Sequence, residues 1–157
     1  VSAEFRLTSP ASGDVLTKFA TLPVSRVTQA ATLPLFAYFP PPVFANPQVT
    51  LQVQTAMQAE EASTAPAVTV SEPLVEINAD GSAARVSGEV AVDAGSKDAS
   101  AIWITAVAFD AQGNILGVRR WESSQTVKAG EEIPYEMWVY STSGTIATVE
   151  LFTEADS

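Results

Sequence analysis

Arg119, Arg120 and Trp121 are the residues whose types and spacing best fit a binding surface in this chain. On a β-strand, Arg119 and Trp121 point to the same face, because successive side chains alternate. An exposed guanidinium beside an indole makes a compact contact patch of the kind that protein interfaces favour. The alternative is that the arginine stems cover the sheet and pair with Glu136 or Glu122. The triplet therefore indicates either a contact patch or a covered, ion-paired sheet surface.

Two pairs of adjacent glutamates, Glu60-Glu61 and Glu131-Glu132, are candidates for acid and base. General acid–base catalysis needs both carboxyl groups within reach of one substrate. Adjacent residues on a strand point to opposite faces, so neither pair can act together across a substrate. We therefore expect these glutamates to be solvated surface charges.

Asp110 and Asn114 flank Gly113 in a spacing that faintly resembles a calcium loop. The run lacks the repeated acidic ligands and the closing bidentate glutamate that such loops need. The same residues are typical of a hairpin turn in which Gly113 takes a positive φ. Asp80-Gly81 and Gly13-Asp14 predict turns of the same kind.

Histidine and cysteine are both absent from the 157 residues. Without them the chain has no Ser-His-Asp or Cys-His nucleophile, no thiolate or imidazole metal site and no disulfide. We therefore predict a protein that is not an enzyme, with no catalytic residues, no cofactor and no metal site.

The charge balance narrows the possible partners. Eight basic and eighteen acidic side chains give a net charge of −10, which repels phosphate backbones and anionic lipid headgroups. The absence of any apolar run of eighteen residues predicts that this segment does not insert into a membrane. We expect neither nucleic acid nor a bare anionic membrane as a partner.

The second half of the chain shows strand-like alternation separated by turn residues. Residues 84–92 alternate small or apolar with polar side chains, as a strand with one wet face does. Residues 102–109 are apolar on both faces, as a central strand covered on each side would be. Short strands with turns between them favour a β-sandwich, with strands predicted at 68–70, 74–77, 84–92, 102–109, 115–121, 133–140 and 148–153.

Residues 13–55 repeat without a gap at residues 113–155. The shift of one hundred residues keeps turn glycines, a proline and apolar positions in step: Gly13 with Gly113, Val27 with Val127, Pro34 with Pro134, Tyr38 with Trp138 and Leu51 with Leu151. Upstream, Phe5 and Leu7 match Val107 and Phe109 if the loop before Gly13 is two residues longer. A repeat of this kind predicts an all-β chain made of two copies of one small fold.

The first copy contains only the later strands, predicted at 1–7, 15–21, 33–39 and 48–55. We therefore predict three parts: an incomplete first repeat at 1–57, a linker at 58–66 and a complete second repeat at 67–157. One explanation is that the chain is a piece of something longer, since Val1 opens directly into a strand without a leader. The other is that a strand from another chain completes the open sheet edge.

The run from Ala106 to Asn114, followed by Ala129 to Tyr135, resembles the FxLYD-type domain of bacterial envelope proteins. In that pattern an aromatic-Asp pair ends a strand, a glycine makes the hairpin, and a glycine followed by Pro-aromatic opens the next long strand. Phe109-Asp110 occupies the aromatic-Asp position here, and Leu7-Thr8 occupies it in the first copy. The resemblance implies two tandem immunoglobulin-like β-sandwich repeats, the first lacking its N-terminal strands. It also implies an exported, extracellular or cell-surface module, and it carries over no catalytic residue.

The aromatic residues divide between core and surface. Trp103 lies in the doubly apolar strand, where sandwiches commonly bury one large aromatic, so we predict that it is buried. In residues 133–140, one face carries Tyr135, Met137 and Val139 and the other carries Trp138 and Tyr140. The first face is the more apolar and should face the core. Trp138 and Tyr140 then lie on a partly exposed face, with Phe36 and Tyr38 on the equivalent face of the first copy.

These observations leave two functions open. The first is a structural or protein-interaction module of the cell envelope, whose partner is another subunit or the upstream part of the same chain. The second is an accessory domain that binds carbohydrate, because exposed planar rings stack on sugars. We favour the interaction module, with Arg119, Trp121, Trp138, Tyr140 and Tyr38 as its possible contact patch. An exposed, coplanar arrangement of Trp103, Trp121 and Trp138 would favour the carbohydrate-binding domain instead.

Overall fold

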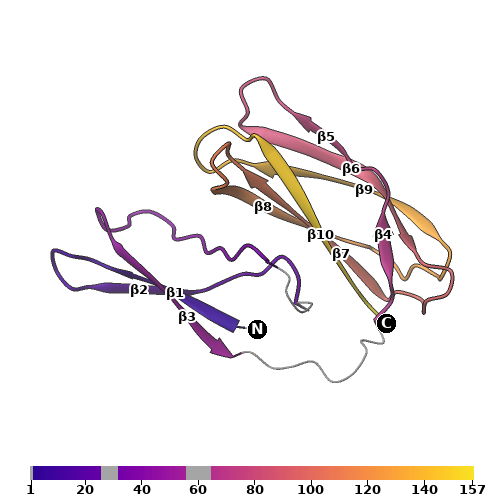
Figure 1. Cartoon of the computed structure of the whole chain (residues 1–157), viewed down its shortest axis with the longest axis horizontal. Helices are drawn as coiled ribbons and strands as arrows, with labels where there is room; N and C mark the ends of the chain where they lie inside the picture. The colour runs from indigo at the N-terminus through magenta and orange to yellow at the C-terminus, as the bar shows by residue number, and fades with distance from the viewer. Residues whose placement is uncertain (1, 26–31, 56–64) are drawn as a thin grey trace. The chain divides into compact units, whose positions relative to one another are not determined.

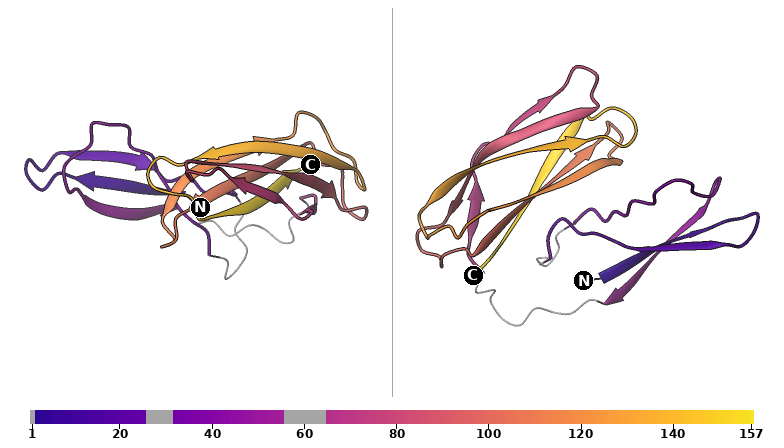
Figure 2. Two further views of the ribbon diagram at one scale, coloured as in Figure 1. Left: turned by 90° about the horizontal axis from the view of Figure 1, so that it is seen from above. Right: turned by 180° about the vertical axis from the view of Figure 1, so that it is seen from behind.

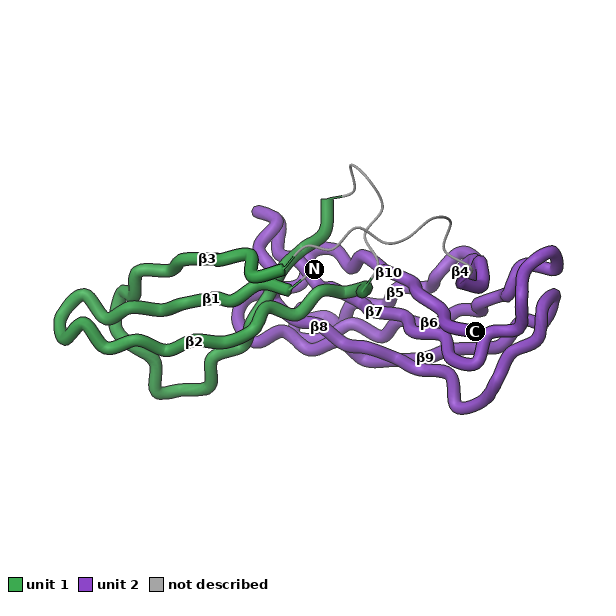
Figure 3. Tube along the Cα trace, turned by 90° about the horizontal axis from the view of Figure 1, so that it is seen from below, with its two compact units in different colours: residues 1–60 green, residues 61–157 purple. Residues whose placement is uncertain are grey.

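The computed structural model describes residues 2–25, 32–55 and 65–157, and it divides the chain into two compact units. Unit 1 comprises residues 1–60 and unit 2 comprises residues 61–157 (Figures 1 and 3). Within the described residues there are ten β-strands and no helix. The predicted all-β class is therefore confirmed, and each unit is described by itself below.

Unit 2 consists of two antiparallel sheets (Figure 2). One sheet has the order β10-β7-β8, and in the other β6 pairs with β4 and β5 along one edge and with β9 along the opposite edge. All seven strands predicted from the sequence are present, and every strand end lies within three residues of its predicted position. Their bounds are β4 Val68–Val70, β5 Leu74–Ile77, β6 Ala83–Val92, β7 Ala101–Phe109, β8 Ile115–Glu122, β9 Glu132–Tyr140 and β10 Thr148–Asp156.

The core of unit 2 lies between the two sheets. Alternate residues of each strand point inward, as the period of two requires. In β9 the inward residues are Tyr135, Met137 and Val139, all nearly inaccessible to solvent, whereas Trp138 and Tyr140 point outward. The predicted division of this strand into a core face and an exposed face is confirmed. The inward residues of the facing sheet include Ile102, Ile104, Ala106, Ala108 and Leu116.

Trp103 is not part of this core, so its predicted burial is wrong. Ile102 and Ile104 are fully buried, and Trp103 lies between them on the opposite face of β7, only partly covered. There the guanidinium carbon of Arg120 lies 5.0 Å from the centroid of the indole ring, which is a cation–π contact. A strand that is apolar on both faces does not reveal which face meets the other sheet, and the isoleucines occupy that face.

Unit 1 contains a three-stranded antiparallel sheet with the order β2-β1-β3. Its strands are β1 Ser2–Thr8, β2 Val15–Phe19 and β3 Gln48–Thr55. The order matches β8-β7-β10 of unit 2. Thr8 pairs with Val15 and Gln48, just as Phe109 pairs with Ile115 and Thr148.

This register corrects the alignment of the first hairpin. Thr8, and not Leu7, corresponds to Phe109, so the first loop is one residue longer than its counterpart and not two. The aromatic-Asp position of the first copy is therefore Thr8-Ser9.

Ser9 and Asp110 hold the two hairpin turns in similar ways. The Asp110 carboxylate accepts hydrogen bonds from the backbone N–H groups of Gln112, at 2.9 Å, and of Asn114, at 2.8 Å. Together with the side chain of Asn114, these donors lower the pKa of Asp110. The Ser9 hydroxyl accepts from the backbone N–H of Ser12 at 3.2 Å. Gly13, Gly81 and Gly113 all have positive φ, so the predicted turns are confirmed.

The strand predicted at 33–39 is wrong. In this part of unit 1 only a single bridge forms, between Thr21 and Phe36. The equivalent strand of unit 2, β9, takes its ladder hydrogen bonds from β6, and no described strand of unit 1 corresponds to β6. Pro34 also lacks the N–H that a ladder needs. Most of the predicted linker at 58–66, and the match of Val27 with Val127, fall outside the described residues.

One face of the unit 1 sheet is apolar and covered only in part: Leu7 of β1 is 8% exposed, whereas the β3 side of the face is open to solvent. Leu7 pairs with Val49 and Phe5 pairs with Leu51, so these side chains share a face. Val49 is 59% exposed and Leu51 is 46% exposed. At the register-equivalent positions of unit 2, Val149 and Leu151 pair with Ala108 and Ala106 and pack against the core between the sheets. The same face is therefore covered by a second sheet in unit 2, whereas in unit 1 its β3 side is exposed.

Tyr135→Phe is expected to stabilise unit 2 by about 1 kcal/mol, because a buried hydroxyl without a partner retains its desolvation penalty. Tyr135 is 3% exposed and lies over Gly88, and among the described residues its hydroxyl has no hydrogen-bond partner. Urea unfolding followed by the NMR signals of β6 and β9 measures the change. A loss of stability would mean that the hydroxyl has a partner.

The same substitution should also change how the stability of unit 2 depends on pH in alkaline solution. Burial raises the pKa of Tyr135 above its ordinary value of 10.0. A raised folded-state pKa contributes stability that is present below pH 10 and is lost as the pH rises through the folded-state pKa. Tyr135→Phe should remove this component of the alkaline loss.

Candidate functional site

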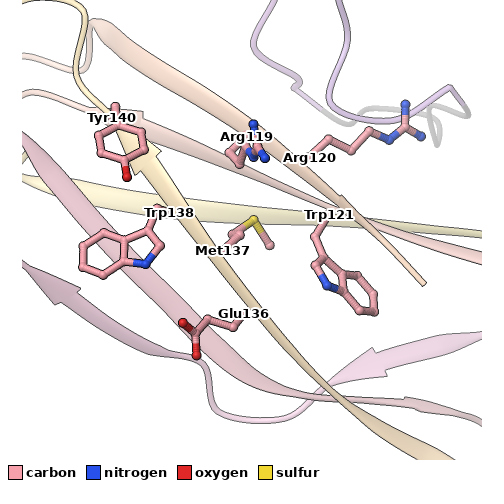
Figure 4. A pocket seen from close by; sticks show the side chains of 7 residues that line it. All are labelled: Arg119, Arg120, Trp121, Glu136, Met137, Trp138 and Tyr140. Carbon is pink, nitrogen blue, oxygen red and sulfur yellow. The ribbon is translucent and has the colours of Figure 1, made fainter. Parts of the chain in front are cut away.

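A groove with a volume of about 350 Å³ lies between β8 and β9 of unit 2 (Figure 4). We call it the β8–β9 groove. It is lined by Arg119, Arg120 and Trp121 from β8 and by Glu136, Met137, Trp138 and Tyr140 from β9.

Gly117 allows the two strands to approach closely. β8 is an edge strand of one sheet and β9 an edge strand of the other. A Cβ atom at Gly117 would collide with the backbone carbonyl oxygen of Tyr140. Just beyond this contact, the backbone N–H and the hydroxyl of Thr142 both donate to the carbonyl of Leu116 at 2.8 Å. Gly117 was not among the predicted site residues, although an isolated glycine inside a strand is a signal of close backbone approach.

Trp138 and Tyr140 form a two-ring surface at the groove. They are two residues apart on the outward face of β9, with ring centroids 6.5 Å apart and ring planes inclined by 21°. Trp138 is 42% exposed and Tyr140 is 65% exposed. Figure 4 shows the two rings side by side, and Arg119 lines the same groove from β8. We call this pair the aromatic platform.

Arg119 is exposed, and in the part of the chain that the structure describes no acceptor pairs with it. The predicted alternative, an ion pair with Glu136, does not form. Instead, Glu136 accepts a hydrogen bond of 2.7 Å from Arg85, whose guanidinium also reaches Glu76 at 3.0 Å. The hydrogen bond from Arg85 lowers the pKa of Glu136. Arg119 therefore keeps its donors available in the groove.

Trp121 and Arg120 contribute less to the open surface. Trp121 packs against the core and against the ring of Tyr135, with centroids 6.0 Å apart and an interplanar angle of 56°. Arg120 belongs to the opposite face of β8, where it covers Trp103. Trp103, Trp121 and Trp138 thus occupy three separate environments, so the coplanar arrangement that would favour a carbohydrate-binding domain does not form. The exposed ring pair is Trp138 and Tyr140 instead.

Four of the five residues predicted as a contact patch line the groove: Arg119, Trp121, Trp138 and Tyr140. The fifth, Tyr38, belongs to unit 1, where it is 60% exposed. It is not among the residues that line the groove.

Within the described ranges, no cluster of three or more carboxylates is arranged to hold a metal ion. In the same ranges, no helix is long and apolar enough to cross a membrane. Comparison of the chain with protein-family models, curated proteins and solved structures gives no match.

Proposed function

We propose that this chain is a non-catalytic structural and protein-interaction module of the extracellular space or cell envelope, and part of a larger surface protein or assembly. In this proposal the two units are tandem immunoglobulin-like repeats of the FxLYD type. The matching strand orders β2-β1-β3 and β8-β7-β10, with matching registers at Thr8 and Phe109, support the repeat.

The exposed β3 side of the apolar face of unit 1 is the observation that carries the proposal. Val49 and Leu51 occupy positions whose counterparts in unit 2 pack against a facing sheet. Exposed apolar surface of this kind is characteristic of sites that bind another polypeptide. The facing layer in this proposal is polypeptide, supplied by a preceding segment of the same protein or by another subunit.

The distribution of charged side chains between the two units is consistent with this role. Residues 1–60 contain three basic and three acidic side chains, whereas residues 61–157 contain five basic and fifteen acidic ones. Long-range electrostatic repulsion between two such molecules therefore comes mainly from unit 2. The sheet of unit 1, whose unit carries as many basic as acidic side chains, can approach another polypeptide with little repulsion. The strongly acidic unit 2 contributes solubility.

Leu51→Asn provides the test. In the isolated chain the exposed apolar side chains of β3 are expected to drive association as the concentration rises, and Leu51→Asn should shift the chain toward monomer. Thr50→Asn is the matched control, because Thr50 pairs with Arg6 on the other face of the same strand. Sedimentation velocity measures both variants.

Hydrogen exchange can give the result that contradicts the proposed covering layer. If the chain is a stable monomer and the amides of β1 are as protected as those of β7, unit 1 needs no covering layer. The proposal is then wrong.

A further inference from the structure

We propose that the β8–β9 groove binds a glycan. The aromatic platform of Trp138 and Tyr140 stacks against the faces of its pyranose rings, and Arg119 donates hydrogen bonds to its oxygen atoms. This is a second binding site, on unit 2, and it does not depend on the covering of unit 1.

The geometry of the aromatic platform carries the first step. The face of a pyranose ring presents several C–H groups together, and these pack on the flat face of an aromatic ring. Trp138 and Tyr140 have nearly parallel planes and neighbouring centroids, so they offer adjacent stacking positions along β9. Both rings are exposed, while Tyr135, Met137 and Val139 of the same strand pack inward. Two exposed rings held in this way are available to a ligand and contribute little to the core.

Polar groups beside the platform carry the second step. A sugar lying on the rings directs its hydroxyl groups outward around its edge, and these need partners. Arg119 offers guanidinium donors that no described residue uses, and the hydroxyl of Tyr140 can both donate and accept. Glu136 is held by Arg85, so it does not neutralise Arg119. The groove therefore pairs apolar ring faces with free donors, as a sugar site requires.

Size favours a glycan over a protein as the occupant, and the charge of unit 2 is compatible with a neutral glycan. A volume of about 350 Å³ lies in the range of small-ligand pockets. Seven lining residues are far fewer than the roughly 20–30 per side of a standard protein interface. A neutral oligosaccharide also meets no repulsion from the acidic side chains of unit 2, whereas an acidic protein does. A uronic acid would be repelled at long range and attracted locally by Arg119.

Titration of the full 157-residue chain with defined oligosaccharides tests the proposal. The probes are the hexamers of β-1,4-glucose, β-1,4-xylose and α-1,4-galacturonic acid, and the tetramer of N-acetylglucosamine, each taken to millimolar concentration. NMR follows the indole N–H signals and the amides of β8 and β9. We expect at least one probe to shift the indole signal of Trp138 and leave that of Trp103 in place.

Substitutions assign the binding to the groove. Trp138→Ala and Tyr140→Ala should each weaken binding by about tenfold or more, equivalent to roughly 1.4 kcal/mol, and Trp138→Phe should retain part of the affinity. Tyr38→Ala removes an equally exposed aromatic from unit 1 and should have no effect. Arg119→Gln should weaken every probe and should weaken galacturonate most. Unchanged β6 and β7 amide signals establish that the variants are folded.

Three results would overturn the proposal. One is that no probe shifts the Trp138 signal. Another is that Trp138→Ala binds as well as the original chain. The third is that no probe binds and Trp138→Ala abolishes self-association, in which case the groove is a protein contact.

Discussion

Gly117→Ala is expected to destabilise unit 2 by about 3 kcal/mol, at the upper end for insertion of a single methyl group into a packed region. The added Cβ would meet the backbone carbonyl oxygen of Tyr140, which cannot rotate away as a side-chain atom could. β8 and β9 must therefore separate, and the hydrogen bonds from Thr142 to Leu116 lengthen or break. Urea unfolding followed by NMR signals of β6 and β9 measures the loss.

Gly95→Ala is the matched control for this substitution. Gly95 has no atom within 4 Å of an added Cβ and its φ is not positive. Alanine there should be neutral or should stabilise by a few tenths of a kcal/mol, about the size expected from reduced entropy of the unfolded chain. If the two alanine variants lost the same amount, the close approach of β8 and β9 would not be the cause.

Ile104→Ala is expected to destabilise unit 2 by about 3 to 4 kcal/mol, as large-to-small changes at fully buried positions do. Ile104 is 0% exposed and lies between the two sheets. The adjacent substitution Trp103→Ala removes a larger side chain but should cost only about 1 to 2 kcal/mol, because the indole is partly exposed and its partner is a surface cation–π contact. Circular dichroism during urea unfolding compares the two without depending on tryptophan fluorescence.

The order of these two losses is the decisive outcome. A greater loss for Trp103→Ala than for Ile104→Ala would place the indole in the core. The assignment of the two faces of β7 would then be reversed.

The strands of unit 2 could be predicted from the sequence because their patterns are local. Alternation in β6 and β9 marks one face as apolar, and glycines with positive φ mark the turns between strands. The same alternation assigned Tyr135 and Met137 to the core face of β9, and Trp138 and Tyr140 to its exposed face. It therefore predicted the exposed rings of the groove.

The incorrect or missing predictions concern residues whose structure depends on a partner far away in the sequence. Residues 33–39 have the apolar pattern of β9, but a strand also needs a neighbour that supplies hydrogen bonds, and no counterpart of β6 is present among the described residues. The face of Trp103 depends on which side of β7 meets the second sheet. The contact of Gly117 with Tyr140 joins two strands from different sheets: the glycine inside a strand signals a close approach, but the local pattern does not identify its partner.

The placement of strand ends in each unit has a mechanical consequence. In unit 1, Ser2 pairs with Thr55, so the start of β1 and the end of β3 lie together. In unit 2, Val68 pairs with Val92 and Asp156 pairs with Ala101, so β4 begins and β10 ends beside the single loop that joins β6 to β7. Tension applied through these ends would separate neighbouring strands starting from one end, so that their hydrogen-bonded residue pairs break one after another. Each unit would therefore yield at a lower force than a fold loaded in shear, in which many pairs must break at once.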